Sequence, residues 1–140
     1  MSYYVRYFAD QAVTLKAIGT GLSGVDPQFK IDGGELMRGP ELLGELEISA
    51  SGSDLFAEDL ASKIAELERL TNPAARQVIT RLRAVKAIVT LRVLDGERDP
   101  DVTWDLITPL WSVLPTLSTG LTQSDGQGFY DGSQLVIALA

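Results

Sequence analysis

The chain has 140 residues, of which 45% are hydrophobic and 22% charged, and its 19 acidic and 12 basic side chains give a net charge of −7. This length and composition predict one globular domain, residues 1–140, and exclude disordered and fibrous architectures. The chain contains neither histidine nor cysteine, the side chains most often used in metal sites, nucleophilic catalysis and proton transfer near neutral pH. We therefore expect no catalytic residue, no metal and no cofactor, while an enzyme that uses carboxylates alone remains an open alternative.

The sequence predicts neither a membrane span nor a secretory signal. Its apolar stretch Val113–Leu121 is interrupted by Pro115 and is shorter than the ~18 residues that a bilayer span needs. The N-terminus lacks a basic region followed by an apolar one, so we expect a cytoplasmic protein. The negative net charge repels nucleic acid and anionic lipid, and we expect neither as a partner. Four clustered basic side chains are interpreted as a solvated helix surface: Arg76, Arg81, Arg83 and Lys86.

The first half of the chain predicts a strand, a short helix and three further strands. Alternating aromatic side chains indicate a strand over Tyr3–Ala9, and Thr14 is the expected N-cap of a helix that ends at Gly21 and Gly24. Gly33-Gly34 favours a tight hairpin between strands at 29–32 and 35–38. Residues 41–50 alternate between an apolar and a mostly acidic face, which is typical of a half-exposed strand.

The second half predicts two helices, a central strand, a long helix and terminal strands. The expected elements are a helix over Asp54–Leu70, a helix beginning at Asn72-Pro73, a buried strand over Lys86–Leu94, a helix from Pro100, and strands over Leu121–Ser124 and Gln134–Leu139 around Gly128-Phe129-Tyr130. Pro109 and Pro115 predict a kink in the long helix near Thr108. Its expected buried stripe is Val102, Leu106, Leu110, Val113 and Leu117.

This order of elements predicts an α+β fold with a mostly antiparallel sheet and helices on one face. The strand-helix-strand-strand order occurs in 3–50 and again in 86–140, which suggests a pseudo-duplication joined by the helices of 54–85. Tandem modules of this order resemble the small-molecule-binding domain of the GyrI-like family. The resemblance implies a sensor that presents an aromatic side chain and a buried glutamate to a cationic or amphipathic ligand, and Glu35, Glu45 and Trp111 are available for such roles.

Several motifs are interpreted as structural rather than catalytic. Gly19–Gly24 matches G-x-G-x-x-G, but it falls at the end of a predicted helix, whereas a dinucleotide fingerprint lies at the start of one. We therefore interpret it as a helix-terminating loop. Glu45 and Glu47 share the strand face opposite the core, so we expect solvated charges. The spacing in 125–132 does not fit a calcium loop and favours tight turns that bury Phe129.

Trp104 and Trp111 lie seven residues apart and therefore on one face of the long helix. Core burial, a ligand pocket and a partner interface all remain open for them. With Tyr130 and Asp131, which a recognition loop would present, they are the candidate ligand- or partner-binding residues. We expect a non-enzymatic acidic domain that contacts a basic protein. The alternative is a sensor of hydrophobic small molecules with a pocket of Trp104, Trp111 and Tyr130, and a homodimer also remains open.

Overall fold

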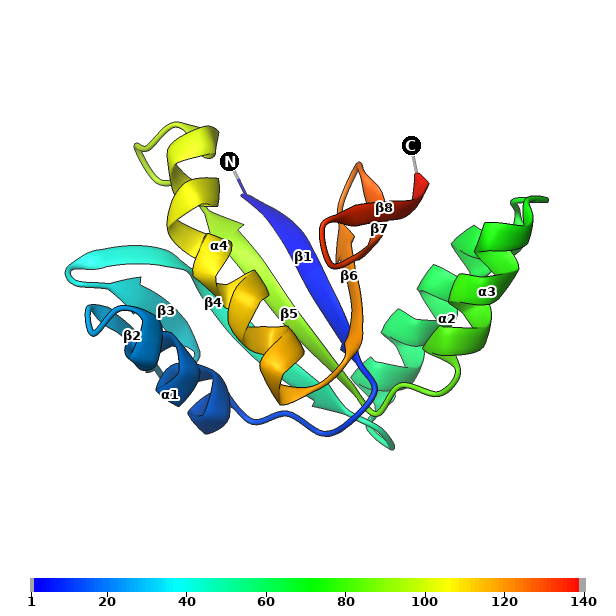
Figure 1. Ribbon diagram of the computed structural model, residues 1–140, viewed down its shortest axis with the longest axis horizontal. Coiled ribbons are helices and arrows are strands. Elements are labelled where there is room, and N and C mark those ends of the chain that lie inside the picture. The colour runs from blue at the N-terminus through cyan, green and yellow to red at the C-terminus, as the bar shows by residue number, and fades with distance from the viewer. Residues whose placement is uncertain (1, 139–140) are drawn as a thin grey trace.

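A computed structural model describes residues 2–138, and within them the chain forms four helices and one antiparallel sheet of eight strands (Figure 1). The strands are β1 (Ser2–Ala9), β2 (Phe29–Asp32), β3 (Glu35–Arg38), β4 (Glu41–Ala50), β5 (Ala87–Leu94), β6 (Gly120–Ser124), β7 (Gly128–Asp131) and β8 (Gln134–Ala138). The helices are α1 (Leu15–Val25), α2 (Asp54–Glu68), α3 (Pro73–Leu82) and α4 (Pro100–Leu117). The strand order is β2-β3-β4-β5-β1-β6-β7-β8. This confirms the predicted α+β class and its antiparallel sheet, while Leu139, the expected end of the last strand, lies outside the described residues.

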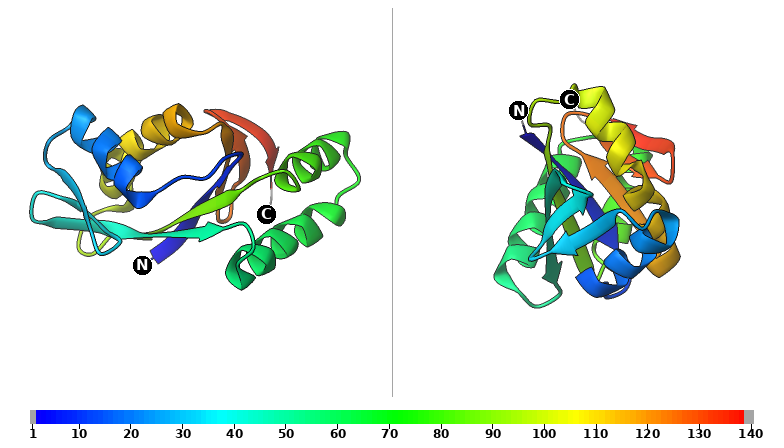
Figure 2. Two further views of the ribbon diagram at one scale, coloured as in Figure 1. Left: turned by 90° about the horizontal axis from the view of Figure 1, so that it is seen from below. Right: turned by 90° about the vertical axis from the view of Figure 1, so that its left-hand side faces the viewer.

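The two faces of the sheet are covered by different helices, so the expectation of helices on one face only is wrong. Val5, Tyr7 and Val89 belong to a core packed under α1 and α4, the helices of the two predicted halves. Phe8 and Ile88 alternate with these residues along β1 and β5, so they point to the opposite face, where they pack with α2 and α3 (Figure 2). We call the two faces the α1/α4 face and the α2/α3 face.

The predicted duplication is not confirmed. Strand β4 of the first half pairs with β5 of the second, and β6 of the second half pairs with β1 of the first. Moving outward from the central β5–β1 pair, the first half therefore runs β4, β3, β2, whereas the second half runs β6, β7, β8. The two meanders have opposite chain order, so a two-fold axis through the central pair does not relate them.

Helix α1 continues through both glycines that were expected to end it. It runs to Val25, so the whole Gly19–Gly24 segment is helical, and the interpretation of this segment as a helix-terminating loop is wrong. Gly21 lies inside the helix because α1 packs closely on α4 there, with Val113 directly opposite. Close approach of two helices, rather than chain reversal, accounts for this glycine.

Helix α4 runs unbroken through Pro109 and Pro115. The expected stripe is partly wrong, because Val102 is 48% exposed while Thr103 and Ile107 are fully buried. Helix α4 contacts α1 at Val113 and also packs on the core of the sheet. Because it is covered on both of these sides, its buried face lies about one residue away from the expected stripe. Among the described residues, no helix combines the length and apolar character needed to cross a membrane.

Candidate functional site

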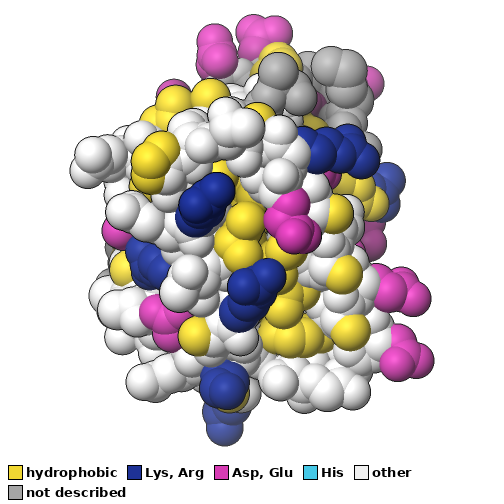
Figure 3. Space-filling model, turned by 90° about the vertical axis from the view of Figure 1, so that its right-hand side faces the viewer, with side chains coloured by type: hydrophobic (Ala, Val, Ile, Leu, Met, Phe, Trp, Pro, Cys, Tyr) yellow, Lys and Arg dark blue, Asp and Glu magenta, His cyan; other side chains and the backbone are white. Residues whose placement is uncertain are grey.

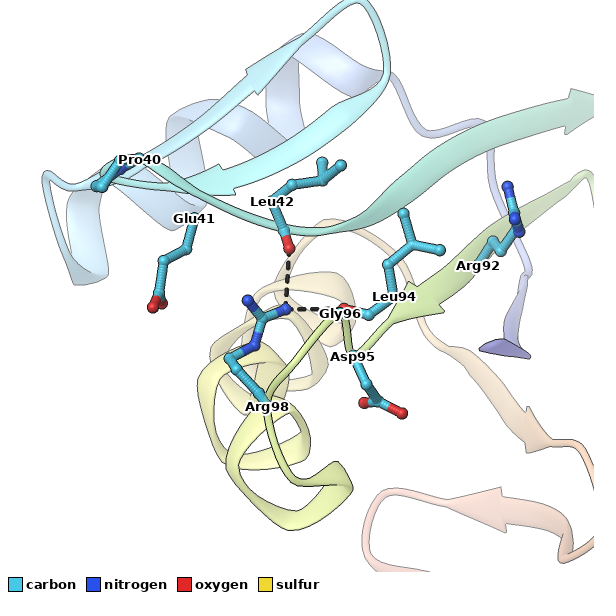
Figure 4. Close-up of a pocket in the computed structure, with 8 residues that line it drawn as sticks. All are labelled: Pro40, Glu41, Leu42, Arg92, Leu94, Asp95, Gly96 and Arg98. Atoms are coloured by element: carbon cyan, nitrogen blue, oxygen red, sulfur yellow. Dashed lines mark hydrogen bonds between the residues drawn. The ribbon is translucent and has the colours of Figure 1, made fainter. Parts of the chain in front are cut away.

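A hollow of about 660 Å³ opens where β4 begins and β5 ends (Figure 4). We call it the acidic hollow. Its wall is formed by Pro40, Glu41, Leu42, Arg92, Leu94, Asp95, Gly96 and Arg98. Because β4 and β5 are neighbours, the start of one strand meets the end of the other and the loop that leads to α4. The hollow therefore gathers side chains from segments about 50 residues apart in the sequence.

Arg98 ties the three segments of this wall together. Its Nη2 donates hydrogen bonds to the carbonyl oxygens of Leu42, at 2.9 Å, and Leu94, at 2.8 Å. Its Nε donates to Oγ1 of Thr103 in the first turns of α4, at 3.2 Å. A guanidinium group holds such divergent acceptors well because its donors are fixed in one plane. Arg98 is therefore directed into the protein and acts as a clamp between β4, β5 and α4.

Asp95 is a buried carboxylate at this hollow. The residue is only 5% exposed, and its Oδ1 atom has no hydrogen-bond partner among the described residues. Figure 4 shows its carboxylate pointing away from the guanidinium of Arg98. Burial, and then the charge of Asp95, raises the pKa of the Tyr3 phenol above its usual value. A buried carboxylate oxygen without a donor is costly, so Asp95 is an unusual group to find in this position.

Further carboxylates surround Asp95 on the loop and the first turns of α4. The segment 95–105 carries five acidic side chains and one basic one, Arg98, a net charge of −4. The acidic side chains are Asp95, Glu97, Asp99, Asp101 and Asp105. The four other acidic side chains are exposed. Val102, an apolar residue of the same segment, is 48% exposed. We call this segment the acidic end of the molecule.

The α2/α3 face is open beside the hollow. Glu45, Arg92 and Tyr4 form one row across β4, β5 and β1, and Glu47, Thr90 and Arg6 form the next. Arg92 donates to Glu45 at 2.9 Å, an exposed ion pair. As expected, Glu45 and Glu47 lie exposed on one strand face, opposite the core under α1 and α4.

A second hollow, of about 540 Å³, lies between the end of α2 and the β6–β7 turn. Its wall is formed by Lys63, Glu66, Arg69, Leu70, Gln123, Asp125, Gly126 and Ala138. Arg6 borders it, since its Nη1 donates to Gln123 and to Asp125, each at 3.1 Å. The Nζ atom of Lys63 lies 3.4 Å from Oε1 of Glu66, which makes them an ion pair. Most charges of this hollow are thus already paired.

The four candidate site residues are only partly brought together. Trp104 and Trp111 stack with ring centroids 6.1 Å apart and pack against the α1/α4 core. The Nε1 atom of Trp111 is buried without a partner among the described residues. Tyr130 donates its hydroxyl to Gln127, and Asp131 pairs with Arg81 at 3.2 Å. The described lining of neither hollow includes any of the four.

The residues suggested by the GyrI-like resemblance are not gathered at one site. Glu35 and Glu45 are exposed and face each other across β3 and β4, whereas Trp111 packs on the other side of the sheet. Within the described residues, no three acidic side chains form a group that could hold a metal ion. No family model matches the chain, and no curated protein or solved structure matches it either.

Sequence reasoning missed Asp95 and Arg98 as site residues. The sequence Asp95-Gly96-Glu97-Arg98 indicates a polar turn. The structure has this turn, because the backbone N–H of Arg98 donates to the carbonyl oxygen of Asp95 at 3.0 Å. The density of acidic residues around it was the available signal. The burial of Asp95 depends on its tertiary surroundings, and β5, which leads into this loop, has neighbours β1 and β4 that are distant in sequence.

Proposed function

We propose that this chain is a binding domain whose acidic end docks a basic segment of a partner protein, with one lysine or arginine side chain entering the acidic hollow. The observation that carries the proposal is the buried Asp95 carboxylate, whose Oδ1 atom has no donor among the described residues. A cationic side chain in the hollow would supply the missing opposite charge.

The charges in the wall favour a cationic occupant over an anionic one. Arg98 is directed into the protein, and Arg92 is paired with Glu45. The charges that face an occupant of the hollow are therefore mainly those of Glu41 and Asp95. Either carboxylate would repel an anion and attract a guanidinium or ammonium group. Figure 4 shows the two carboxylates well apart, so one cationic side chain would pair with only one of them, and we place it at Asp95.

The surroundings of the hollow suit contact with a protein rather than with an isolated ion. The net charge of −4 over 95–105 attracts basic partners and accelerates their association. Val102 offers an exposed apolar group between Asp99, Asp101 and Asp105. An apolar centre with a charged rim is the usual layout of a protein contact surface.

The test is an NMR titration of the ¹⁵N-labelled protein at low salt with the basic peptide acetyl-Gly-Arg-Lys-Arg-Gly-amide. We expect the amide signals of 95–105 and of Glu41 to shift in a saturable manner. Asp95→Asn keeps the shape of the side chain and removes its charge. We expect this substitution to weaken binding of the peptide at least about fivefold. Glu58→Gln, at an exposed position of α2, is the matched control and should leave the affinity unchanged.

Two results would count against the proposal. One is an equal loss of affinity in Asp95→Asn and Glu58→Gln, which would mean that only the net charge matters. The other is a set of shifts located away from the acidic end. The urea midpoint of each variant shows whether it remains folded under the titration conditions.

A small-molecule sensor is the second candidate, and one observation favours it. The buried Nε1 atom of Trp111 lacks a partner among the described residues and lies beside the stacked ring of Trp104. A ligand with an acceptor group would complete that donor. Tryptophan emission measured against a panel of hydrophobic cations separates the candidates, because only the sensor predicts a ligand-dependent shift.

A further inference from the structure

Strand β8 is an edge strand that carries neither charged side chains nor proline. It is the last strand of the sheet, and no described strand pairs with its outer side. Its residues Gln134–Ala138 include no charged residue and no proline, and Leu135 is 46% exposed. The opposite edge, β2, carries Lys30 and Asp32 within only four residues. Charged side chains on an edge strand discourage pairing, so β2 is protected in this way, whereas β8, which is similarly short, is not.

The surroundings of β8 are basic. The segment Arg69–Lys86 contains five basic and no acidic residues, so the rest of the chain has a net charge of −12. Helix α3, which lies in this segment, packs against β8. Figure 3 shows lysine and arginine side chains on this side of the molecule, interspersed with acidic side chains, around an apolar seam. The open edge strand therefore adjoins a basic segment of a strongly acidic protein, although α2, which packs on α3, has a net charge of −4.

Basic side chains stand near both ends of β8. Arg69 and Lys63 line the second hollow together with Ala138, at one end of the strand. At the other end Arg81 pairs with Asp131, which is opposite Gln134 across the β7–β8 hairpin. The arrangement offers backbone hydrogen bonds along the strand. At the Ala138 end it also offers the guanidinium of Arg69, which has no ion pair among the described residues, whereas Lys63 and Arg81 are already paired with Glu66 and Asp131.

We propose that β8 binds an extended acidic segment of another protein, which adds to the sheet as a further antiparallel or parallel strand. Backbone hydrogen bonds would supply affinity, and Arg69 would select acidic side chains. The charge argues against a second copy of this chain as the occupant. Antiparallel pairing of two β8 strands keeps both α3 helices on one face of the joined sheet, so their basic segments would repel.

The test uses a fluorescein-labelled peptide of four Glu-Val repeats and measures its anisotropy on titration with the full chain. We expect saturable binding that weakens as salt is added. A Lys-Val peptide of the same length should not bind. A Glu-Val peptide that is N-methylated at alternate residues keeps its charge but loses its backbone donors, and it should bind at least about tenfold more weakly.

Two protein variants locate the site. Arg69→Gln should weaken binding of the acidic peptide about threefold to fivefold. Lys16→Gln removes the same charge from an exposed position of α1 and should have no effect. Amide exchange should slow in 134–138 when the unmodified peptide is bound, because an added strand covers the open edge of β8.

The proposal is overturned if the N-methylated peptide binds as well as the unmodified one, or if exchange in 134–138 does not change. Either result would mean that the peptide adheres by charge alone. It is also overturned if the peptide fails to bind while sedimentation shows a dimer that Leu135→Lys abolishes, since a second copy would then occupy the edge. None of these results bears on the acidic end, which uses different residues and a peptide of opposite charge.

Discussion

Gly21 of α1 lies directly against Val113 of α4, and a Cβ atom added to Gly21 would fall 2.6 Å from Cγ1 of Val113. The contact sets how closely the two helices that cover the α1/α4 face approach each other. Glycine inside a helix costs about 1 kcal/mol relative to alanine, so the close approach must compensate for this cost through packing.

Gly21→Ala should therefore destabilise the protein by about 1 kcal/mol, because overpacking of about 1–3 kcal/mol exceeds the gain in helix propensity. Gly24→Ala in the same helix is the matched control, since nothing lies within 4 Å of its added Cβ. It should stabilise the protein by about 0.5–1 kcal/mol. Urea unfolding measures both, and stabilisation by both substitutions would show that the helices separate freely.

The combination of Gly21→Ala with Val113→Ala tests the contact itself. The shorter side chain makes room for the new methyl group, so Gly21→Ala should cost less in the Val113→Ala background than in the wild type. Equal costs in the two backgrounds would place the strain elsewhere.

Arg98→Ala should lower the free energy of unfolding by about 2 kcal/mol, because it removes hydrogen bonds to Leu42, Leu94 and Thr103 and leaves their acceptors unpaired. Arg92→Ala removes only an exposed ion pair with Glu45 and should cost less than about 1 kcal/mol. The two arginines lie on the same hollow, so they form a matched comparison. Similar urea midpoints for the two variants would argue against the clamp.

Alkaline pH should destabilise the protein through Tyr7. Burial, and next the charge of Asp10, raises the pKa of Tyr7 to about 12, and its hydroxyl donates to the carbonyl of Ser118 at 2.6 Å. The unfolded chain loses this proton near pH 10 and the folded chain only near pH 12. The free energy of unfolding should therefore fall between these values, by at most about 1.4 kcal/mol per pH unit.

Tyr7→Phe removes the titrating group, so the fall above pH 10 should become shallower. At neutral pH the variant should be less stable by about 1 kcal/mol, the value of a typical buried hydrogen bond. Unfolding in urea at several pH values from about 9 to 11.5 measures both effects. An unchanged alkaline slope would assign the decline to other groups.

Tryptophan emission should be blue-shifted and only partly quenched by acrylamide, because Trp104 and Trp111 are half-buried against the α1/α4 core. Trp104→Phe and Trp111→Phe report each indole separately. Emission that stays constant with hydrophobic cations supports a packing role. Emission typical of free indole would contradict the packing seen in the structure.

Local sequence features predicted most of the elements and their caps. The expected helix starts at Thr14 and Asn72 are N-caps, since each side chain accepts a hydrogen bond from the backbone N–H three residues later. Ser53 does the same at the start of α2. Gly33 and Gly34 have φ values of 57° and 89°, which their hairpin requires. These features depend on residues within a few positions of each other, so the sequence alone determines them.

The tertiary structure alone decided what these elements enclose. Gly21 and Gly24 both lie inside α1, yet only Gly21 meets α4, and no local feature of the sequence distinguishes the two glycines. Likewise, the strand order that separates the two meanders arises from pairing between residues about 40 to 120 positions apart. No local pattern carries this information, because pairing partners are chosen by the packing of the whole sheet.

The candidate site follows the same division. The sequence determined that the protein is acidic, that it lacks the usual catalytic side chains, and that 95–105 is rich in carboxylates. Only the tertiary structure buried Asp95 and turned Arg98 inward. The physical reason is that the burial of a loop carboxylate depends on its tertiary surroundings, and β5, which leads into this loop, acquires its neighbours β1 and β4 only when the sheet forms.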